Sequence, residues 1–231
     1  MSQIRVLIAD DHALMREGLR GLLQTKDGIE IVGEAETGRE AVELAVALKP
    51  DVVLMDIAMP LLSGLEATRQ LSKRVPSTRV LVLSSYNDDD FVQQLAEVGG
   101  AGYLLKQGTY KDVLRAIHEA HKGNAFFSPA ICKRLSDKYR ESIVRGAPLN
   151  EGKPRPLTSR QTELLQLIAE GCGNKQAAAQ LGLSIKTVER HRQRLMDKLD
   201  IHDVAGLTRY AISRGLVESS AAARTTVLQS P

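Results

Sequence analysis

The sequence has few of the features that mark secreted and membrane proteins. Its 231 residues include only two cysteines, Cys132 and Cys172, which lie far apart and without a CxxC partner. We therefore expect two reduced thiols in a cytoplasmic protein. No apolar run approaches the ~18 residues of a membrane helix. The N-terminus lacks a basic segment followed by a long apolar core. From these absences we expect that the chain has no membrane span and no secretory leader.

Charge is distributed unevenly along the chain. Residues 1–124 contain 14 Lys and Arg against 18 Asp and Glu, a net of −4, whereas residues 125–231 contain 17 against 10, a net of +7. An acidic half joined to a basic half indicates different partners, with a polyanion the natural partner of the second half. Net charge can also drift along a chain without function, so charge alone does not settle the question.

The first half alternates short apolar runs with amphipathic segments. Continuous apolar runs separated by helices are typical of a parallel sheet that is covered on both faces. In such a sheet, ligands and catalytic residues gather at the carboxyl ends of the strands. The expected strands are 4–9, 29–35, 52–55, 79–84 and 102–106, and the expected helices are 13–25, 38–48, 64–74, 88–98 and 111–121.

Polar side chains stand where these strands end. Asp10 and Asp11 follow the first strand, Asp56 the third, Ser84 the fourth and Lys106 the fifth. Any one of them could be an ordinary cap or turn residue, and Asp10 or Asp11 could simply begin the next helix. Together they predict three carboxylates, a hydroxyl and an ammonium at one edge of the sheet. An all-oxygen acidic site of this kind suits Mg²⁺.

This combination of groups favours phosphoryl transfer to an aspartate. A carboxylate beside Mg²⁺ can accept a phosphoryl group, while the metal and Lys106 neutralise charge on the phosphoryl oxygens. A phosphatase or dehalogenase with an aspartate nucleophile is the rival class, but it would carry a second Asp where this chain has Ala58. The first strand is also not followed by a GxGxxG turn, so dinucleotide binding is not supported.

Four motifs, "LIADDH", "VVLMDIAMP…SG", "VLVLS" and "GAGYLLK", make the first 122 residues resemble the receiver domain of bacterial response regulators. The resemblance implies a flavodoxin-like, doubly wound sheet of five parallel strands in the order 2-1-3-4-5. It also implies a phosphoryl acceptor rather than an enzyme, promoting only its own phosphorylation and dephosphorylation. The implied site residues are Asp56 as phosphoacceptor, Asp10, Asp11, Asp56 and the Ala58 carbonyl as Mg²⁺ ligands, Ser84 and Lys106 at the phosphoryl group, and Tyr103 as the switch aromatic.

Two departures from that family pattern leave the phosphorylation residues intact. Gln107 follows Lys106 where many receivers have proline. "LLSG" at 61–64 replaces the commoner glycine-containing turn after the proline. His12 stands beside the acids, and we expect a helix-start residue outside the metal site.

The middle of the chain changes character. Residues 123–153 are predicted to be a linker, with apolar spacing over 129–144 that is compatible with a connector helix. The segment 145–156 holds three prolines and two glycines, which is typical of an exposed joint. We therefore expect a receiver domain over 1–122, a second domain over 154–218, and a tail without order over 219–231.

The second domain has the pattern of a helix-turn-helix. Thr158 is placed to cap a helix that Gly171 ends. A short Ala-rich helix over 174–182 follows, and Gly182 permits a tight turn before Ser184 caps a basic helix to about Leu199.

The basic helix is the candidate for reading DNA. Val188, Leu195 and Leu199 form a core-facing stripe, and polar groups near the helix start suit contacts with base edges. A solvated amphipathic helix remains the simpler alternative. The candidate DNA contacts are Lys186, Thr187, Glu189, Arg190, Arg192, Gln193, Arg194 and Lys198.

The motifs "KTVE.H" (186–191), "L..KL" (195–199) and "RYAI..GL" (209–216) make this segment resemble the LuxR-type helix-turn-helix of the NarL/FixJ response regulators. The resemblance implies a four-helix all-α domain, with the helix over 203–214 as a dimer surface. The implied partners are a sensor histidine kinase, double-stranded DNA with inverted half-sites, a second copy on activation, and RNA polymerase. The expected function is transcription control by phosphorylation of Asp56. The alternative is phosphorylation-independent control with the receiver as a dimerisation module.

Overall fold

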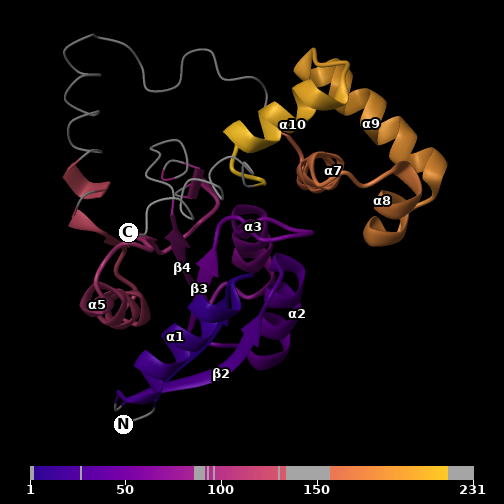
Figure 1. Ribbon diagram of the computed structural model, residues 1–231. Coiled ribbons are helices and arrows are strands. Elements are labelled where there is room, and N and C mark those ends of the chain that lie inside the picture. The colour runs from indigo at the N-terminus through magenta and orange to yellow at the C-terminus, as the bar shows by residue number, and fades with distance from the viewer. Residues whose placement is uncertain are drawn as a thin grey trace.

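The computed structural model describes residues 3–26, 28–85, 92, 94–95, 97–129, 131–133 and 157–217. The chain forms an α/β region followed by a helical region (Figure 1). Within the described residues, no helix is both long and apolar enough to cross a membrane.

The α/β region is built on one parallel sheet with the strand order β2-β1-β3-β4-β5-β6. Its strands are β1 (Ile4–Ala9), β2 (Ile29–Ala35), β3 (Val52–Asp56), β4 (Arg79–Ser84), β5 (Gly102–Leu105) and β6 (Phe126–Phe127), and its helices are α1 (Ala13–Gln24), α2 (Gly38–Leu48), α3 (Gly64–Arg74) and α5 (Tyr110–His121). The predicted five-strand order is confirmed, and β6 is an addition to it. The prediction missed β6 because two residues are too few to show a period.

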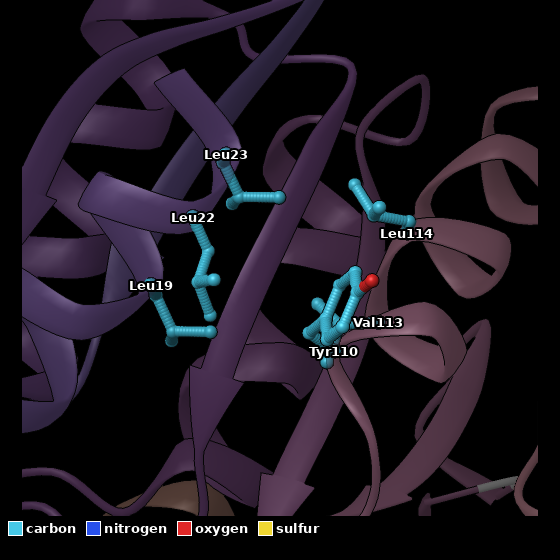
Figure 2. Close-up of a pocket in the computed structure, with 6 residues that line it drawn as sticks. All are labelled: Leu19, Leu22, Leu23, Tyr110, Val113 and Leu114. Atoms are coloured by element: carbon cyan, nitrogen blue, oxygen red, sulfur yellow. The ribbon is translucent and has the colours of Figure 1, made fainter. Parts of the chain in front are cut away.

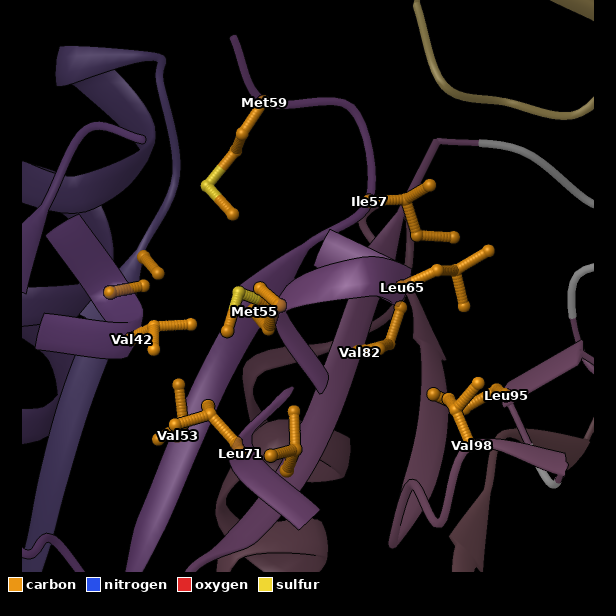
Figure 3. Close-up of a cluster of buried hydrophobic side chains, with 14 of the residues drawn as sticks. Val42, Val53, Met55, Ile57, Met59, Leu65, Leu71, Val82, Leu95 and Val98 are labelled. Atoms are coloured by element: carbon orange, nitrogen blue, oxygen red, sulfur yellow. The ribbon is translucent and has the colours of Figure 1, made fainter. Parts of the chain in front are cut away.

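Both faces of the sheet are covered because its strands are apolar on both sides. Val53 and Met55 of β3 point into a cluster with α2 and α3, which Figure 3 shows, whereas Val52 and Leu54 point into a cluster with α1 and α5. Burial on both faces fixes the register of β3, since a slip of one residue would exchange the two sets. The end of β3 is therefore held in one position.

Two expected helices of the first half and linker fall largely outside the described residues. Of the predicted helix 88–98, residues 92, 94, 95, 97 and 98 are described; the first four are helical and residue 98 lies in a turn. Of the predicted connector helix 129–144, residues 129 and 131–133 are described and are helical. The predicted joint over 145–156 and the predicted tail over 219–231 lie outside the described part of the chain.

The helical region contains α7 (Ser159–Ala169), α8 (Asn174–Leu181), α9 (Ile185–Leu199) and α10 (Val204–Ser213). Thr158 caps α7 as expected, with its hydroxyl accepting from the Gln161 amide. Gly182 ends α8 in the left-handed conformation, at φ 62°, and Ser184 then caps α9. Leu165, Val188 and Leu207 are among the fully buried residues that join the four helices in one core.

Candidate metal centre and nucleic-acid interface

The register of the sheet brings three predicted site residues together. Ala9 pairs with Met55 and Ser84 with Leu105, so the carboxyl ends of β1, β3, β4 and β5 are level. Asp10 follows β1, Asp56 ends β3, and Lys106 follows β5. The Lys106 ammonium lies 2.8 Å from Asp10 Oδ2 and 2.8 Å from Asp56 Oδ2. One cation thus bridges two carboxylates at this edge of the sheet.

Burial controls the ionisation of this cluster. Asp56 is 3% exposed, and burial raises its pKa to about 6, although Lys106 opposes the shift and Asp10 adds to it. Burial also disfavours the charge on Lys106, but the attraction of Asp56 and Asp10 outweighs it and raises the pKa of Lys106. The cluster therefore holds more carboxylates than the one ammonium can neutralise, and it would attract a further cation.

The donor set fits a hard divalent cation. Among the described residues, Asp10, Asp11, His12 and Asp56 offer ligand atoms that all lie within 4.8 Å of one another. Carboxylate oxygens are the ligands that Mg²⁺ takes in proteins, usually together with water. Asp11 is exposed whereas Asp10 and Asp56 are buried, so the group opens to solvent on the Asp11 side. Asp10, Asp11 and Asp56 are thus the residues that could hold the metal.

His12 lies beside these acids, as the sequence indicated. It is the N-cap residue of α1, as expected, but its side chain makes no capping hydrogen bond. Its Nδ1 lies 2.7 Å from Asp11 Oδ1 and 3.3 Å from Asp10 Oδ1. Burial lowers the pKa of His12, but the two acids outweigh it and raise the pKa. His12 therefore contacts the acids directly, and its place outside the metal site stays a prediction.

A tight turn after β3 explains why glycine follows Ser63. The Gly64 amide donates to the Ile57 carbonyl at 2.8 Å, which folds the start of α3 back onto the strand end. A Cβ at position 64 would lie 1.8 Å from the Asp56 carbonyl oxygen. Ser63 caps α3, with its hydroxyl accepting from the Glu66 amide. The loop 57–63 is thereby tied to the strand that carries Asp56.

The other predicted site residues of the first domain lie at the same edge or beneath it. Ser84 is buried at the end of β4, and its carbonyl accepts from the Lys106 amide at 2.8 Å. Ala58 is buried in the loop after Asp56. Tyr103 is fully buried on β5, in the cluster that packs under α2 and α3. The roles of these three residues stay predictions.

Arg16 is a residue of this site that the sequence reasoning missed. It is buried on α1, and its guanidinium donates to the Asp10 carbonyl at 2.7 Å and to Glu36. Its Nε also lies 3.8 Å from Glu34. Arg16 therefore holds the turn that carries Asp10 and Asp11. The available signal was a charged residue at a core-facing position of the helix period, in line with Leu19 and Leu23.

The candidate DNA contacts fall into two groups on α9. Lys186, Glu189, Arg190, Gln193 and Arg194 are exposed. Arg192 and Lys198 are half-buried and reach within the domain, Arg192 to Asn174 Oδ1 at 3.3 Å and Lys198 to Gln161 Oε1 at 3.2 Å. The half-buried Thr187 hydroxyl lies 2.8 Å from that of Ser184. The exposed group is thus the surface available to a polyanion.

A second feature that the sequence reasoning missed joins the two domains. Gln166 on α7 is fully buried and hydrogen-bonds to the loop after Asp56. The signal was a polar residue inside the apolar run "LLQLIA", at 164–169. Figure 1 shows α7 next to α3, with α9 on the side of its domain away from α3.

Two family models match the chain. Residues 6–118 match the response regulator receiver domain, and residues 155–211 match the bacterial regulatory proteins of the luxR family. The two matches correspond to the domain with the acidic cluster and to the domain with the basic helix.

Known regulatory proteins are similar to this chain over most of their length. The transcriptional regulatory protein LiaR of Bacillus subtilis is 38% identical over 93% of this chain and 99% of its own. The response regulator protein VraR of Staphylococcus aureus is 35% identical over the same shares. A structure of the RcsB response regulator of Salmonella typhimurium has a TM-score of 0.61 at 26% identity, over 92% of this chain and 98% of that one.

A further structure contains RcsB dimers bound to DNA, with a TM-score of 0.56 at 26% identity, over 92% of this chain and 99% of that one. The two family matches, in this order and over these elements, leave one assignment. The chain belongs to the two-component response regulators of the NarL/FixJ subfamily, which join a receiver domain to a LuxR-type DNA-binding domain.

Proposed function

We propose that this response regulator accepts a phosphoryl group on Asp56 in the presence of Mg²⁺, and that this step controls specific DNA binding by α9. The carrying observation is the Lys106 ammonium placed 2.8 Å from both Asp10 and Asp56, beside a group of acids that can hold a metal. A sensor histidine kinase would supply the phosphoryl group, and homodimers on inverted half-sites would bind the operator. RcsB dimers bound to DNA support dimeric DNA binding by similarity.

The residues of this chain divide the chemistry among them. An Asp56 carboxylate oxygen forms the new bond to phosphorus as the bond between phosphorus and the donor breaks. Bound Mg²⁺ would neutralise charge on the phosphoryl oxygens, with Asp10, Asp11, Asp56 and the Ala58 carbonyl as its protein ligands. Lys106 leaves its contact with Asp56 Oδ2 to bind a phosphoryl oxygen, and Ser84 donates a hydrogen bond to another.

Phosphate incorporation tests this assignment. The wild-type chain incubated with acetyl phosphate and Mg²⁺ should gain the mass of one phosphoryl group, and the gain should vanish with EDTA. Asp56→Asn should show no gain while its circular dichroism spectrum stays that of the wild type. Asp51→Asn is the matched control, because Asp51 lies at the opposite end of β3 and should leave the gain unchanged. An equal gain in Asp56→Asn would overturn the assignment.

A further inference from the structure

The loop between β3 and α3 is held by the DNA-binding domain through a buried glutamine. Gln166 Oε1 accepts from the Ser63 amide at 2.7 Å, and Gln166 Nε2 donates to the Met59 carbonyl at 2.7 Å. The side chain is fully buried, so neither bond competes with water. One amide group of α7 therefore spans the loop that begins directly after Asp56.

Glu170, the C-cap residue of α7 and one turn beyond Gln166, extends this contact. Its Oε1 accepts from the Leu61 amide at 3.1 Å and from Gln166 Nε2 at 2.8 Å. Burial raises the pKa of Glu170, although these two hydrogen bonds oppose the shift. The loop thus binds α7 through the amides of Leu61 and Ser63 and the carbonyl of Met59.

Leu61 adds an apolar contact to the DNA-binding domain, but its backbone is strained. Its φ is 67°, and the Leu62 amide donates to the Pro60 carbonyl at 2.8 Å, which closes a three-residue turn of the rare, strained type. A glycine would adopt this conformation without strain. The Leu61 side chain instead packs against the core of the DNA-binding domain. The contact between domains therefore offsets the strain in the turn.

Docking in this way leaves the DNA-reading surface open. Arg190, Gln193 and Arg194 of α9 are exposed although the two domains are in contact. The docked elements are α7, which lies against α3, and α8, whose Gln180 carbonyl accepts from Arg39 on α2. The contact between the domains acts on the receiver loop and does not cover α9.

We propose that Leu61, Gln166 and Glu170 form an interdomain latch through which the DNA-binding domain holds the loop after Asp56 and restrains its phosphorylation. The first part of this inference, docking through the latch, stands independently of the proposed function; the second part, restraint of phosphorylation, rests on it.

The restraint follows from where the latch acts. The Ile57 amide now donates to Asp56 Oδ1 at 2.8 Å. A phosphoryl group on Asp56 brings new anionic oxygens to this place, and the loop amides must turn toward them. While Met59 and Ser63 are held by Gln166, that movement is opposed. Since the equilibrium coupling between two sites is reciprocal, phosphorylation should weaken docking by the same factor by which docking lowers the equilibrium level of phosphorylation.

Domain tumbling in the full chain tests the latch without reference to phosphorylation. In ¹⁵N relaxation, the wild type should show one rotational correlation time for residues 3–85 and 157–217. Gln166→Ala and Leu61→Gly should each give residues 157–217 a shorter correlation time than residues 3–85. Lys49→Gly is the matched control for Leu61→Gly, because Lys49 also has a positive φ, 48°, but caps α2. Gln24→Ala, on the exposed end of α1, is the control for Gln166→Ala.

The rate of phosphorylation tests the second part. With acetyl phosphate and Mg²⁺, Gln166→Ala and Leu61→Gly should be phosphorylated about tenfold faster than the wild type, because the barrier to phosphorylation no longer includes breaking the latch. The two controls should keep the wild-type rate. Tumbling as one body in both latch variants would overturn the latch. Separate tumbling with an unchanged rate would overturn the restraint. A wild type that takes up no phosphate would refute both the proposed function and the restraint. Docking through the latch would still be tested by the relaxation data alone.

Discussion

The two domains use their charged residues in opposite ways. In the receiver, Asp10 and Asp56 are buried, Lys106 is nearly so, and all three are fixed by one pair of 2.8 Å contacts at the end of a rigid sheet. In the DNA-binding domain, Arg190 and Arg194 stand exposed on α9. The first arrangement is suited to chemistry on one small group, since buried charges act strongly in a low dielectric. The second is suited to a large, hydrated polyanion.

The difference shows what each region contributes to stability. Buried like charges cost the fold free energy unless a cation joins them, whereas exposed charges on a helix cost little. The buried carboxylates of the receiver site therefore lower the stability of the fold, whereas the exposed charges of α9 do not. Substitutions in the receiver site should therefore change stability, whereas substitutions on α9 should change DNA binding.

Removing the buried cation should have the largest effect. Lys106→Ala leaves Asp10 and Asp56 buried without their partner, so the free energy of unfolding in EDTA should fall by ~3–5 kcal/mol. Added Mg²⁺ should recover part of the loss, because the metal supplies positive charge to the same oxygens. Urea unfolding measures both effects. Lys122→Ala is the matched control, because Lys122 pairs with Glu119 at the surface and should leave the unfolding curve unchanged. An equal effect of the two substitutions would break the contrast between buried and exposed charge.

The pH dependence of stability should report the raised pKa of Asp56. Its ordinary value is 3.8 and its folded value is about 6 without metal, so the folded state holds a proton that the unfolded state releases between these values. This contribution is fully present below pH ~4 and is lost as pH rises through about 6. The loss amounts to about 3 kcal/mol at ~1.4 kcal/mol for each pKa unit.

Urea unfolding in EDTA from pH 4 to pH 8 measures this loss. Asp56→Asn cannot titrate, so the decline through pH 6 should be smaller in the variant by that amount, and Mg²⁺ should flatten the wild-type curve. The same decline in the wild type and in Asp56→Asn would show that the folded pKa of Asp56 is not raised.

Substitutions on α9 should weaken DNA binding without loss of stability. Arg190→Ala should cost ~1–3 kcal/mol of specific binding if its guanidinium reads a base, and its thermal midpoint should match the wild type. Arg192→Ala should lower both the affinity and the midpoint, because Arg192 also bonds Asn174. Fluorescence anisotropy with a selected operator measures the affinity, and differential scanning calorimetry measures the thermal midpoint. A fall in the midpoint of Arg190→Ala would mean that the exposed group also supports the fold.

Much of this architecture could be predicted from the hydrophobic periodicity of the sequence and from the position of residues at strand and helix ends. The apolar run at Val52–Met55 predicted a strand buried on both faces, and strand ends in a parallel sheet meet at one edge whatever the loops do. Thr158, Gly182 and Ser184 marked helix boundaries through their local backbone chemistry. The acids, Ser84 and Lys106 could therefore be placed at one edge before any contact was known.

The rest depended on contacts between segments far apart in the chain. Gln166 looked like an exception in an apolar helix face, and its partners, Met59 and Ser63, lie more than 100 residues away. Leu61 showed only as a departure from a glycine-containing turn, and its packing against the second domain is not a local property. Arg16 is polar in sequence but buried in fact, because Glu36 and the Asp10 carbonyl satisfy it. Period and propensity do not contain such pairings.

The affinity of the full chain for its selected operator, with and without beryllofluoride and Mg²⁺ at one salt concentration, tests most directly whether the acidic site governs the DNA-binding helix. Beryllofluoride should tighten binding about tenfold, as coupling between two sites commonly does, and Asp56→Asn should remove the change. Equal affinity of the wild type under both conditions would contradict this coupling, and would favour a receiver that serves only to pair two DNA-binding domains.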